Sequence, residues 1–506
     1  MKRLTGVSAL ALSAMLTPAW ADVTPQQVWD DLNAYMESFG YEVMGMESAQ
    51  GDSLVISDVM MAFPLPEGEG DFAITMEEMS FTDLGDGRVS VSFPEVMPIE
   101  ISVNDGEQVD IVVNYTHDGL EMIVSGTPEA MVYDYSANLL GLSLAGLSVD
   151  GEVITRDMAR VDISMGPVEG STEMAVADGM RALVQNFALG DLRYDMAFND
   201  PDSEDGGTLS GDMAGLIVEG AGVIPVDMVL DPNDPAALFN SGMEMAATYS
   251  HQGGRTEFSV TERGGTTSGQ MTTTGAEFGA EFSAETLSYL IGYSGLAVNL
   301  SGPEIPFPVS AEMAEASFAF TMPLQPSDTP QEAALGVTLA GFTTAEMLWN
   351  IFDPGAVLPR DPLTVSFDLL AQVTPFVSIL DPEAMEQLEM TGGMPGELNA
   401  LTLSDLVIEG AGGLITGAGD FTFDNSDLQS FDGVPRPEGE LQIEVAGANG
   451  LIDKLIQMGL LAEEDAMGAR MMLSMFTVPG DAPDTASSKI VVNEQGHVLA
   501  NGQRIK

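Results

Sequence analysis

The stretch RVSVSFPEVMPIEISVNDGEQVDIVVNYTHDGLEMIVSG, residues 88–126, decides the fold. Apolar and polar residues alternate through four successive runs, and a period of two places the apolar set on one face of a pleated strand. Asp105-Gly106 and Asp118-Gly119 stand between runs, and Asp-Gly favours the tight turn of a β-hairpin. The stretch therefore predicts an antiparallel meander with one apolar face and one polar face.

The rest of the chain extends this pattern. Its 55 glycines and 28 prolines are spread rather than clustered, which is typical of many strands joined by turns. We expect a mainly β (α+β) fold, with large antiparallel meander sheets and a few short amphipathic helices packed on them. The regions expected are an N-terminal β-rich region at 22–325, a candidate linker at 326–342 and a C-terminal α+β region at 343–506. One continuous domain over 22–506 is the alternative.

Several segments have helix signals. Thr24, Pro25 and Gln27 form a capping box with proline in the first turn, before an apolar stripe that ends at Gly40. Thr343 and Glu346 predict a second capped helix, which Pro354-Gly355 would end. The C-terminal region shows a helical pair, one helix over 451–458 and one over 463–475, and the spacing at 284–293 predicts a short helix.

The N-terminus has the three parts of a secretory signal peptide. Basic residues at 2–3 precede an apolar run at 4–16, and Ala19-Trp20-Ala21 has the small-x-small pattern of a cleavage site. We expect a cleavable signal at 1–21 and a mature chain that begins at Asp22. No later run approaches the roughly 18 apolar residues of a membrane helix, so no integral membrane span is expected. The predicted compartment is the periplasm, with the extracellular medium as the alternative.

The charge is strongly negative. Sixteen Lys and Arg against 78 Asp and Glu give −62, a field that repels phosphate backbones. A nucleic-acid partner is therefore not expected. Hydrophobic residues are 45% of the chain, which is far from the composition of disordered proteins. We interpret the charge as a solvated acidic surface.

The sequence shows no motif for catalysis, a metal or a cofactor. The three histidines lie beside turns, without zinc-ligand spacing, and no Gly-x-Ser-x-Gly elbow occurs. In the acidic loop at 200–206 the glycine falls one position late for a calcium loop. The glycines at 410–413 lack the third glycine of a dinucleotide fingerprint. The chain contains no cysteine, so disulfides and thiol chemistry are excluded.

The apolar face of the meander is the candidate ligand-binding site. Its residues are Val109, Ile111, Val113, Tyr115, Leu120, Met122 and Val124. An uncovered face of this kind would bind a lipid or another apolar ligand, whereas a second layer over it would make an ordinary core. The function expected is that of a non-enzymatic exported envelope protein. A periplasmic hydrolase of envelope polymers that uses carboxylates and a purely structural or interaction protein are the alternatives, and the oligomeric state stays open.

Methionine is the one unusual apolar component. The chain has 33 methionines, whose flexible thioethers fill cores or line surfaces that accept varied ligands. Several fall within predicted helix stripes, among them Met36, Met347 and Met471. This placement predicts that they fill the core.

Four segments carry a family resemblance. They are LWNIFDPGAVLPRDP (348–362), FTFDNSDLQSFDGVPRPEGEL (421–441), MGLLAEEDAMGARMMLSMF (458–476) and KIVVNEQGHVLANGQRI (489–505). The chain resembles an uncharacterised domain-of-unknown-function family of exported proteins in marine alphaproteobacteria, and VWDDL (28–32) is similar to that family too. The resemblance implies a family and a compartment, but no activity and no catalytic residues.

Overall fold

The computed structural model describes residues 22–64, 70–226 and 241–506. The predicted signal peptide at 1–21 lies outside them. Strands make up 63% of the structure and helices 11%, with five helices among the described residues. The strand pairs with a described register are antiparallel, as in β1–β2, β11–β12, β19–β20 and β24–β25, and the expected mainly β class with a few helices is confirmed. Within the described part of the chain, no helix has the length and apolar character needed to cross a membrane.

The chain divides into two compact units. The first comprises Met1–Ser268 with Gly279–Ala284, and the second comprises Gly269–Phe278 with Glu285–Lys506. Strands β17 (Gly265–Thr273) and β18 (Gly275–Phe282) contain residues of both units. Each unit is described by itself below.

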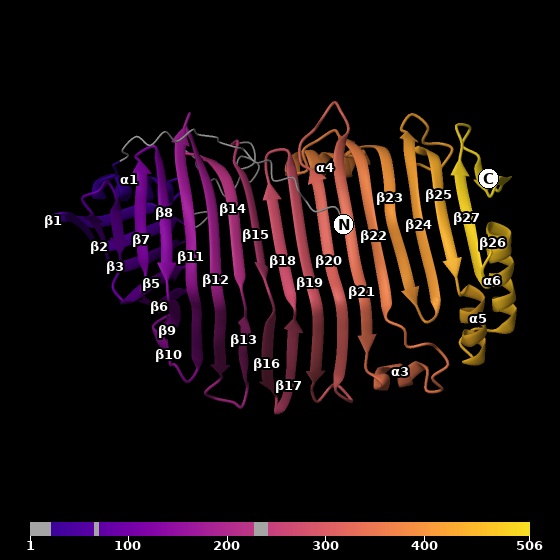
Figure 1. Cartoon of the computed structure of the whole chain (residues 1–506), viewed down its shortest axis with the longest axis horizontal. Coiled ribbons are helices and arrows are strands. Elements are labelled where there is room, and N and C mark those ends of the chain that lie inside the picture. The colour runs from indigo at the N-terminus through magenta and orange to yellow at the C-terminus, as the bar shows by residue number, and fades with distance from the viewer. Residues whose placement is uncertain (1–21, 65–69, 227–240) are drawn as a thin grey trace. The chain divides into compact units, whose positions relative to one another are not determined.

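Within its described residues, the first unit contains one helix and most of the strands shown in indigo to magenta in Figure 1. These elements are α1 (Pro25–Glu37), β1 (Glu42–Gln50), β2 (Ser53–Pro64), β3 (Asp71–Asp83), β4 (Val89–Ser92), β5 (Val96–Asn104), β6 (Gln108–Asp118), β7 (Glu121–Thr127), β8 (Ala130–Ala137), β9 (Leu139–Val149), β10 (Glu152–Ile154), β11 (Ala159–Ala177), β12 (Met180–Asn199), β13 (Gly206–Met213), β14 (Leu216–Pro225), β15 (Glu244–His251) and β16 (Gly254–Glu262).

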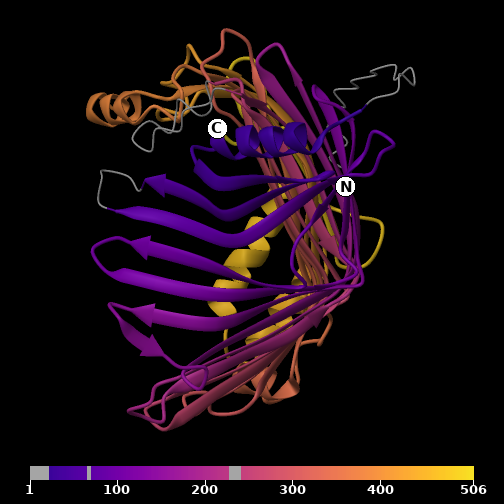
Figure 2. The same cartoon turned by 90° about the vertical axis from the view of Figure 1, so that its left-hand side faces the viewer.

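Helix α1 begins as the sequence predicts. Thr24 accepts a hydrogen bond from the Gln27 amide, the Gln27 side chain accepts from the Thr24 amide, and Pro25 occupies the first turn. The capping box satisfies donors that a helix start leaves free. Figure 2 shows this indigo helix lying along the first strands of the sheet. Val28 and Trp29 are buried there.

A crease crosses the strands of the first unit. Strands β4 and β5 both pair with β3, β8 and β9 both pair with β11, and β13 and β14 both pair with β12. Strands β4 and β5 therefore form one long strand that is interrupted at a single point, and the same holds for β8 with β9 and for β13 with β14. The interruptions lie at 93–95, 119–120, 138, 214–215 and 252–253. In the continuous strands β11 and β12 the same line passes through 166–167 and 190, where the strand pairing skips one residue pair, and we call this line the crease.

Glycines let the crease form. A Cβ on Gly190 would stand 2.2 Å from the Gly166 carbonyl oxygen, and one on Gly166 would stand 2.3 Å from the Asn138 carbonyl oxygen. No real Cβ approaches backbone this closely, so only glycine fits where the folded strands come together. The crease thus divides the sheet into two parts that can face different surroundings.

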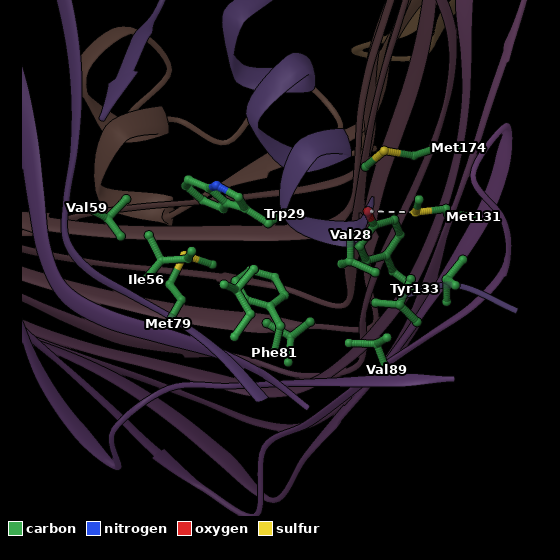
Figure 3. Packing of buried hydrophobic residues seen from close by; sticks show 14 of the residues in the cluster. Val28, Trp29, Ile56, Val59, Met79, Phe81, Val89, Met131, Tyr133 and Met174 are labelled. Atoms are coloured by element: carbon green, nitrogen blue, oxygen red, sulfur yellow. Dashed lines mark hydrogen bonds between the residues drawn. The ribbon is translucent and has the colours of Figure 1, made fainter. Parts of the chain in front are cut away.

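The hydrophobic core of the first unit lies between α1 and one side of the crease. Figure 3 shows Trp29 above Ile56, Met79 and Phe81, with Val28 towards Tyr133. The cluster extends over β4, β7, β8, β11 and β12 through Val89, Val91, Val124, Met131, Tyr133, Met174 and Leu183. Burial of these side chains is the main stabilising term for α1, since each contributes about 1.5–3 kcal/mol.

The second unit, orange to yellow in Figure 1, holds a sheet of side-by-side strands and four helices within its described residues. Its elements are β19 (Thr286–Ser301), β20 (Val309–Pro323), β21 (Gln331–Thr344), α3 (Glu346–Phe352), β22 (Leu363–Pro375), α4 (Pro382–Thr391), β23 (Gly396–Gly410), β24 (Gly413–Asp424), β25 (Arg436–Ala446), α5 (Ala448–Gln457), α6 (Glu463–Phe476), β26 (Val478–Pro479), β27 (Thr485–Val492), β28 (Val498–Ala500) and β29 (Gln503–Arg504).

Two helix expectations are wrong in this unit, and most of the candidate linker forms a strand. The segment at 284–293 is the start of strand β19, because its pairing with β20 overrides a weak helical spacing. Much of the candidate linker at 326–342 is strand, since the alternating Leu335, Val337 and Leu339 pair with β22 from Gln331 onwards. Helix α3 forms, but its N-cap is Ala345 without a side-chain hydrogen bond, because Thr343 belongs to β21.

Candidate ligand-binding face

The residues predicted to bind a ligand separate onto two sides of the crease. Val109, Ile111, Val113 and Tyr115 alternate along β6, and none of them is fully buried. Leu120 lies in the interruption at the crease, and Met122 and Val124 follow on β7. Val124 has no exposed surface, and Met122 packs against the core cluster. The structure therefore brings the four β6 residues together and places the two β7 residues in the core.

Rows of apolar residues extend the β6 face across neighbouring strands. Ile111 pairs with Ile101 on β5 and with Leu147 on β9. Ile163 on β11 pairs with Leu142 and Tyr194, and Leu209 on β13 pairs with Met196 and Phe258. We call these nine residues the open face of the first unit. None of the nine is buried, and Leu142 and Leu209 keep 40% and 38% of their surface exposed.

The opposite side of the same strands is polar. Ser102, Asp110 and Ser148 form a hydrogen-bonded row across β5, β6 and β9, with Ser102 Oγ 3.1 Å from an Asp110 carboxylate oxygen. On the next strands Arg160 binds Asp195. A sheet with one polar face and one apolar face normally packs the apolar face against another layer. Here the polar face is the solvated one, and no described element forms such a layer on the apolar face.

No described helix lies over the open face of the first unit. Helix α1 contacts β1, β2 and β3, on the side of the core cluster. The apolar surface is nevertheless continuous with that core, because Val59 and Met76, which lie on the open side of β2 and β3, belong to the cluster or pack against it. The core cluster therefore covers the face at one end, and along the strands that follow no described helix lies over it.

The second unit has an open face of its own. Ile291, Phe318, Val337, Phe367 and Leu406 stand in one row across β19 to β23, in register strand by strand. Phe318 is 43% exposed and Ile291 39%, and the rings of Phe318 and Phe320 stack with centroids 6.5 Å apart. We call this row, with Tyr289 and Phe320 beside it, the open face of the second unit. Thr338 and Ser366 hydrogen-bond on the opposite side of the sheet.

A buried ion pair anchors α1 at the covered end of the first face. Arg181 Nη1 donates to Asp31 Oδ1 over 2.6 Å, and the Tyr133 hydroxyl donates to Asp31 Oδ2 over 3.0 Å. Arg181 also lies 5.7 Å from the centroid of the Tyr35 ring. Burial, followed by the Asp31 charge, raises the pKa of Tyr133 far above its usual value, so this hydroxyl stays protonated and remains a donor. The arrangement suits structural anchoring, not proton transfer.

Hydrogen bonds hold the carboxyl groups whose pKa values are shifted in the described part of the chain. Burial tends to raise the pKa values of Asp353 and Asp484, but hydrogen bonds lower them, from backbone amides and Arg360 at Asp353 and from backbone amides and the Asn449 side chain at Asp484. The Ser426 hydroxyl and then Arg436 lower the pKa of Asp424. Among the described residues, no group of three or more His, Asp or Glu is arranged to hold a metal. A cavity of about 190 Å³ in the second unit is lined by Asp361, Glu409 and glycine backbone, so it is too small and polar for an acyl chain.

Sequence reasoning missed most of both faces. It found β6, where polar residues separate the apolar ones, but not β19, where Leu290 adds an apolar residue to the other side and hides the alternation. On β11 and β12 the signal was present, since Val161, Ile163 and Met165 alternate with charged and small residues. Pairing register, which joins these runs into rows, cannot be read from one strand alone.

Comparison with known proteins identifies the chain's relatives but no activity. No curated protein and no solved structure matches it. One family model matches residues 196–502, which is more than half of the chain, and its members are described as uncharacterised proteins conserved in bacteria. The chain therefore belongs to the uncharacterised bacterial family DUF2125.

Proposed function

We propose that this protein binds an acyl chain, or a ligand of similar apolar shape, on its open sheet faces. One observation carries the proposal: apolar side chains stand in register across many strands, and no described element covers them. Contiguous apolar surface of this kind marks a ligand, a partner or a site of aggregation. Its strip-like form, one row of side chains continued from strand to strand, suits an extended hydrocarbon.

The energy available is sufficient for binding. Each methylene moved from water onto such a face gains about 0.8 kcal/mol when it is fully buried. Leu142 and Leu209 belong to the open face of the first unit, and their exposed side chains can form those contacts. The shifted carboxyl groups are held as ionised hydrogen-bond acceptors, which supports a binding role over acid catalysis. We place the protein in the periplasm, in accord with the signal expected at 1–21.

The test compares neighbouring positions on opposite sides of one strand. Ile111→Asp puts a charge on the open face, and Val112→Asp puts the same charge on the polar side of β6. Phe367→Asp and Ser366→Asp form the matching pair in the second unit. Protein purified from its native envelope without detergent is extracted with organic solvent, and the extract is measured by lipid mass spectrometry.

We expect bound lipid in the wild type and in the two polar-side variants, and its loss from Ile111→Asp, Phe367→Asp or both. Circular dichroism checks that each variant is folded. A lipid-free wild type that also fails to take up a fluorescent fatty acid contradicts the proposal. Equal loss of lipid from Val112→Asp and Ile111→Asp would do the same, since it would show that the open side of the strand has no special role.

A further inference from the structure

The outer surface of helix α6 carries four exposed methionines. Met467, Met471, Met472 and Met475 are 72%, 62%, 57% and 52% exposed. The sequence predicts that such methionines fill the core, and for this helix that prediction is wrong. Met347 in α3 is also half exposed. Apolar side chains on the solvent face of a surface helix are unusual, because polar residues normally occupy it.

The inward side of α6 is formed by other residues. Ala466 is buried, and Arg470, Leu473 and Thr477 are half-buried at the following three- and four-residue spacings. At 100° per residue, Met475 points almost directly away from this side. Arg470 binds Asp453 of α5, so this side of α6 faces α5. The four methionines therefore lie on the side of α6 that faces away from Ala466 and Arg470.

Three of the methionines form a compact group. Met475 lies four residues after Met471 and three after Met472, so the Cβ atoms of each of these pairs are about 5–6 Å apart. Three rotatable bonds in each side chain let the three sulfur atoms converge on one point above the helix. Met467, one turn before Met471, lies within reach as a fourth donor.

Thioether sulfur is a soft, uncharged donor that selects Cu(I) among biological metal ions. The chain has no cysteine, so its methionines are its only soft ligands. A net charge of −62 raises the local concentration of cations around the protein. Glu463, Glu464 and Asp465 in the first turn of α6 add to this field.

We propose that Met471, Met472 and Met475 bind one soft monovalent cation, Cu(I) by chemical class, on the outer face of α6. This inference is independent of acyl binding, since it concerns other residues and another ligand. It also differs from an apolar docking surface in what it requires. A docking surface needs hydrophobic area, which leucine supplies as well as methionine, whereas a metal site needs the sulfur atoms.

The experiment uses the full chain and Ag(I), which has the coordination preferences of Cu(I) without its redox chemistry. Silver nitrate is titrated in chloride-free buffer and followed by native mass spectrometry and by NMR of ¹³C-labelled methionine methyl groups. The triple variant M471L/M472L/M475L removes the sulfur and keeps an apolar, helix-forming surface. Its matched control, M245L/M271L/M347L, replaces three exposed methionines that lie apart from one another in the sequence.

We expect one Ag(I) per wild-type chain at micromolar concentrations, with shifts confined to the methyl resonances of α6. The control variant should retain this ion and M471L/M472L/M475L should lose it, with an unchanged circular dichroism spectrum. Binding that survives in M471L/M472L/M475L, or that is lost equally in the control, would overturn the proposal. So would a wild-type chain that binds no silver in this range.

Discussion

Arg181 forms a buried ion pair with Asp31, and this contact joins helix α1 to strand β12. The guanidinium is 3% exposed, its Nη1 binds Asp31, and its buried Nε has no hydrogen-bond partner among the described residues. A buried charge of this kind is costly unless its partner is present. The Asp31 carboxylate therefore links α1 to β12 at a point where hydrophobic packing alone would tolerate sliding.

Asp31→Asn should destabilise the first unit by about 3–5 kcal/mol, because it leaves the Arg181 charge buried without its counter-ion. The double variant Asp31→Leu/Arg181→Met removes both charges, and it should lose less stability than Asp31→Asn. Urea denaturation followed by tryptophan fluorescence, to which Trp29 of α1 contributes, gives the comparison. A wild-type midpoint in Asp31→Asn would show that the ion pair has no stabilising role.

A substitution at Gly190 tests how closely the strands approach each other at the crease. Its missing Cβ makes room for the Gly166 carbonyl, so Gly190→Ala forces backbone movement and should destabilise the fold by about 1–3 kcal/mol. Gly468→Ala is the control, since no atom lies within 4 Å of the added methyl group in α6, and helix propensity should make that change stabilising by up to about 1 kcal/mol. Thermal melts of the two variants should move in opposite directions. Equal shifts would mean that strand contact at the crease is not tight.

Among the elements, the β24–β25 hairpin carries a pH-sensitive contact. Asp424 accepts hydrogen bonds from the Ser426 hydroxyl and amide and from Arg436 Nη2, the last over 2.7 Å. The Ser426 hydroxyl and then Arg436 lower the pKa of Asp424 from 3.8 to about 2. Since the folded pKa is the lower one, this contact stabilises the hairpin fully above the unfolded value and is lost as the pH falls from 3.8 towards 2.

We therefore expect the Asp424 carboxyl carbon to titrate near pH 2 in an NMR experiment on the folded protein. Asp424→Asn should remove the corresponding acid-dependent loss of amide protection in β24 and β25, because the asparagine does not titrate. A midpoint for Asp424 at 3.8 would contradict the predicted contact.

The elements also show what the sequence could and could not predict. Strands were predictable wherever polar residues separate apolar ones, as in β6, and α1 was predictable because its capping box is local. The stripe of α6 was found but assigned to the wrong side. A 3.6-residue period locates an apolar stripe, but it does not show which side of the helix packs, and in α6 that side carries Ala466 and Arg470.

The crease lay beyond sequence reasoning for a related reason. Gly166, Gly190 and Gly215 look like ordinary strand or turn glycines, and each is unremarkable by itself. They act together only because pairing places them opposite one another on adjacent strands. The candidate site was predictable only in part. Its β6 residues were found from their alternation, whereas the rows that continue them depend on the pairing register of several strands.

At the scale of the whole molecule, the strong negative charge is the dominant feature. The 78 acidic residues far outnumber the 16 basic ones, and the ion pairs on the sheet surfaces, such as Arg160–Asp195 and Arg255–Glu257, use up few of them. Exposed pairs of this kind stabilise a protein by at most about 1 kcal/mol. The uncompensated acids repel one another in the folded state.

This repulsion should make stability depend on salt. The Debye length falls from about 30 Å at 0.01 M to about 8 Å at 0.15 M, which screens most pairs of exposed carboxylates from one another. The melting temperature should therefore rise between 10 and 300 mM NaCl, and equal ionic strengths of KCl should give the same rise. Sucrose at matched osmolality controls for solute exclusion. A flat or falling melting temperature would show that the acids are compensated locally, and its dependence on EDTA would then reveal whether divalent cations supply the compensation.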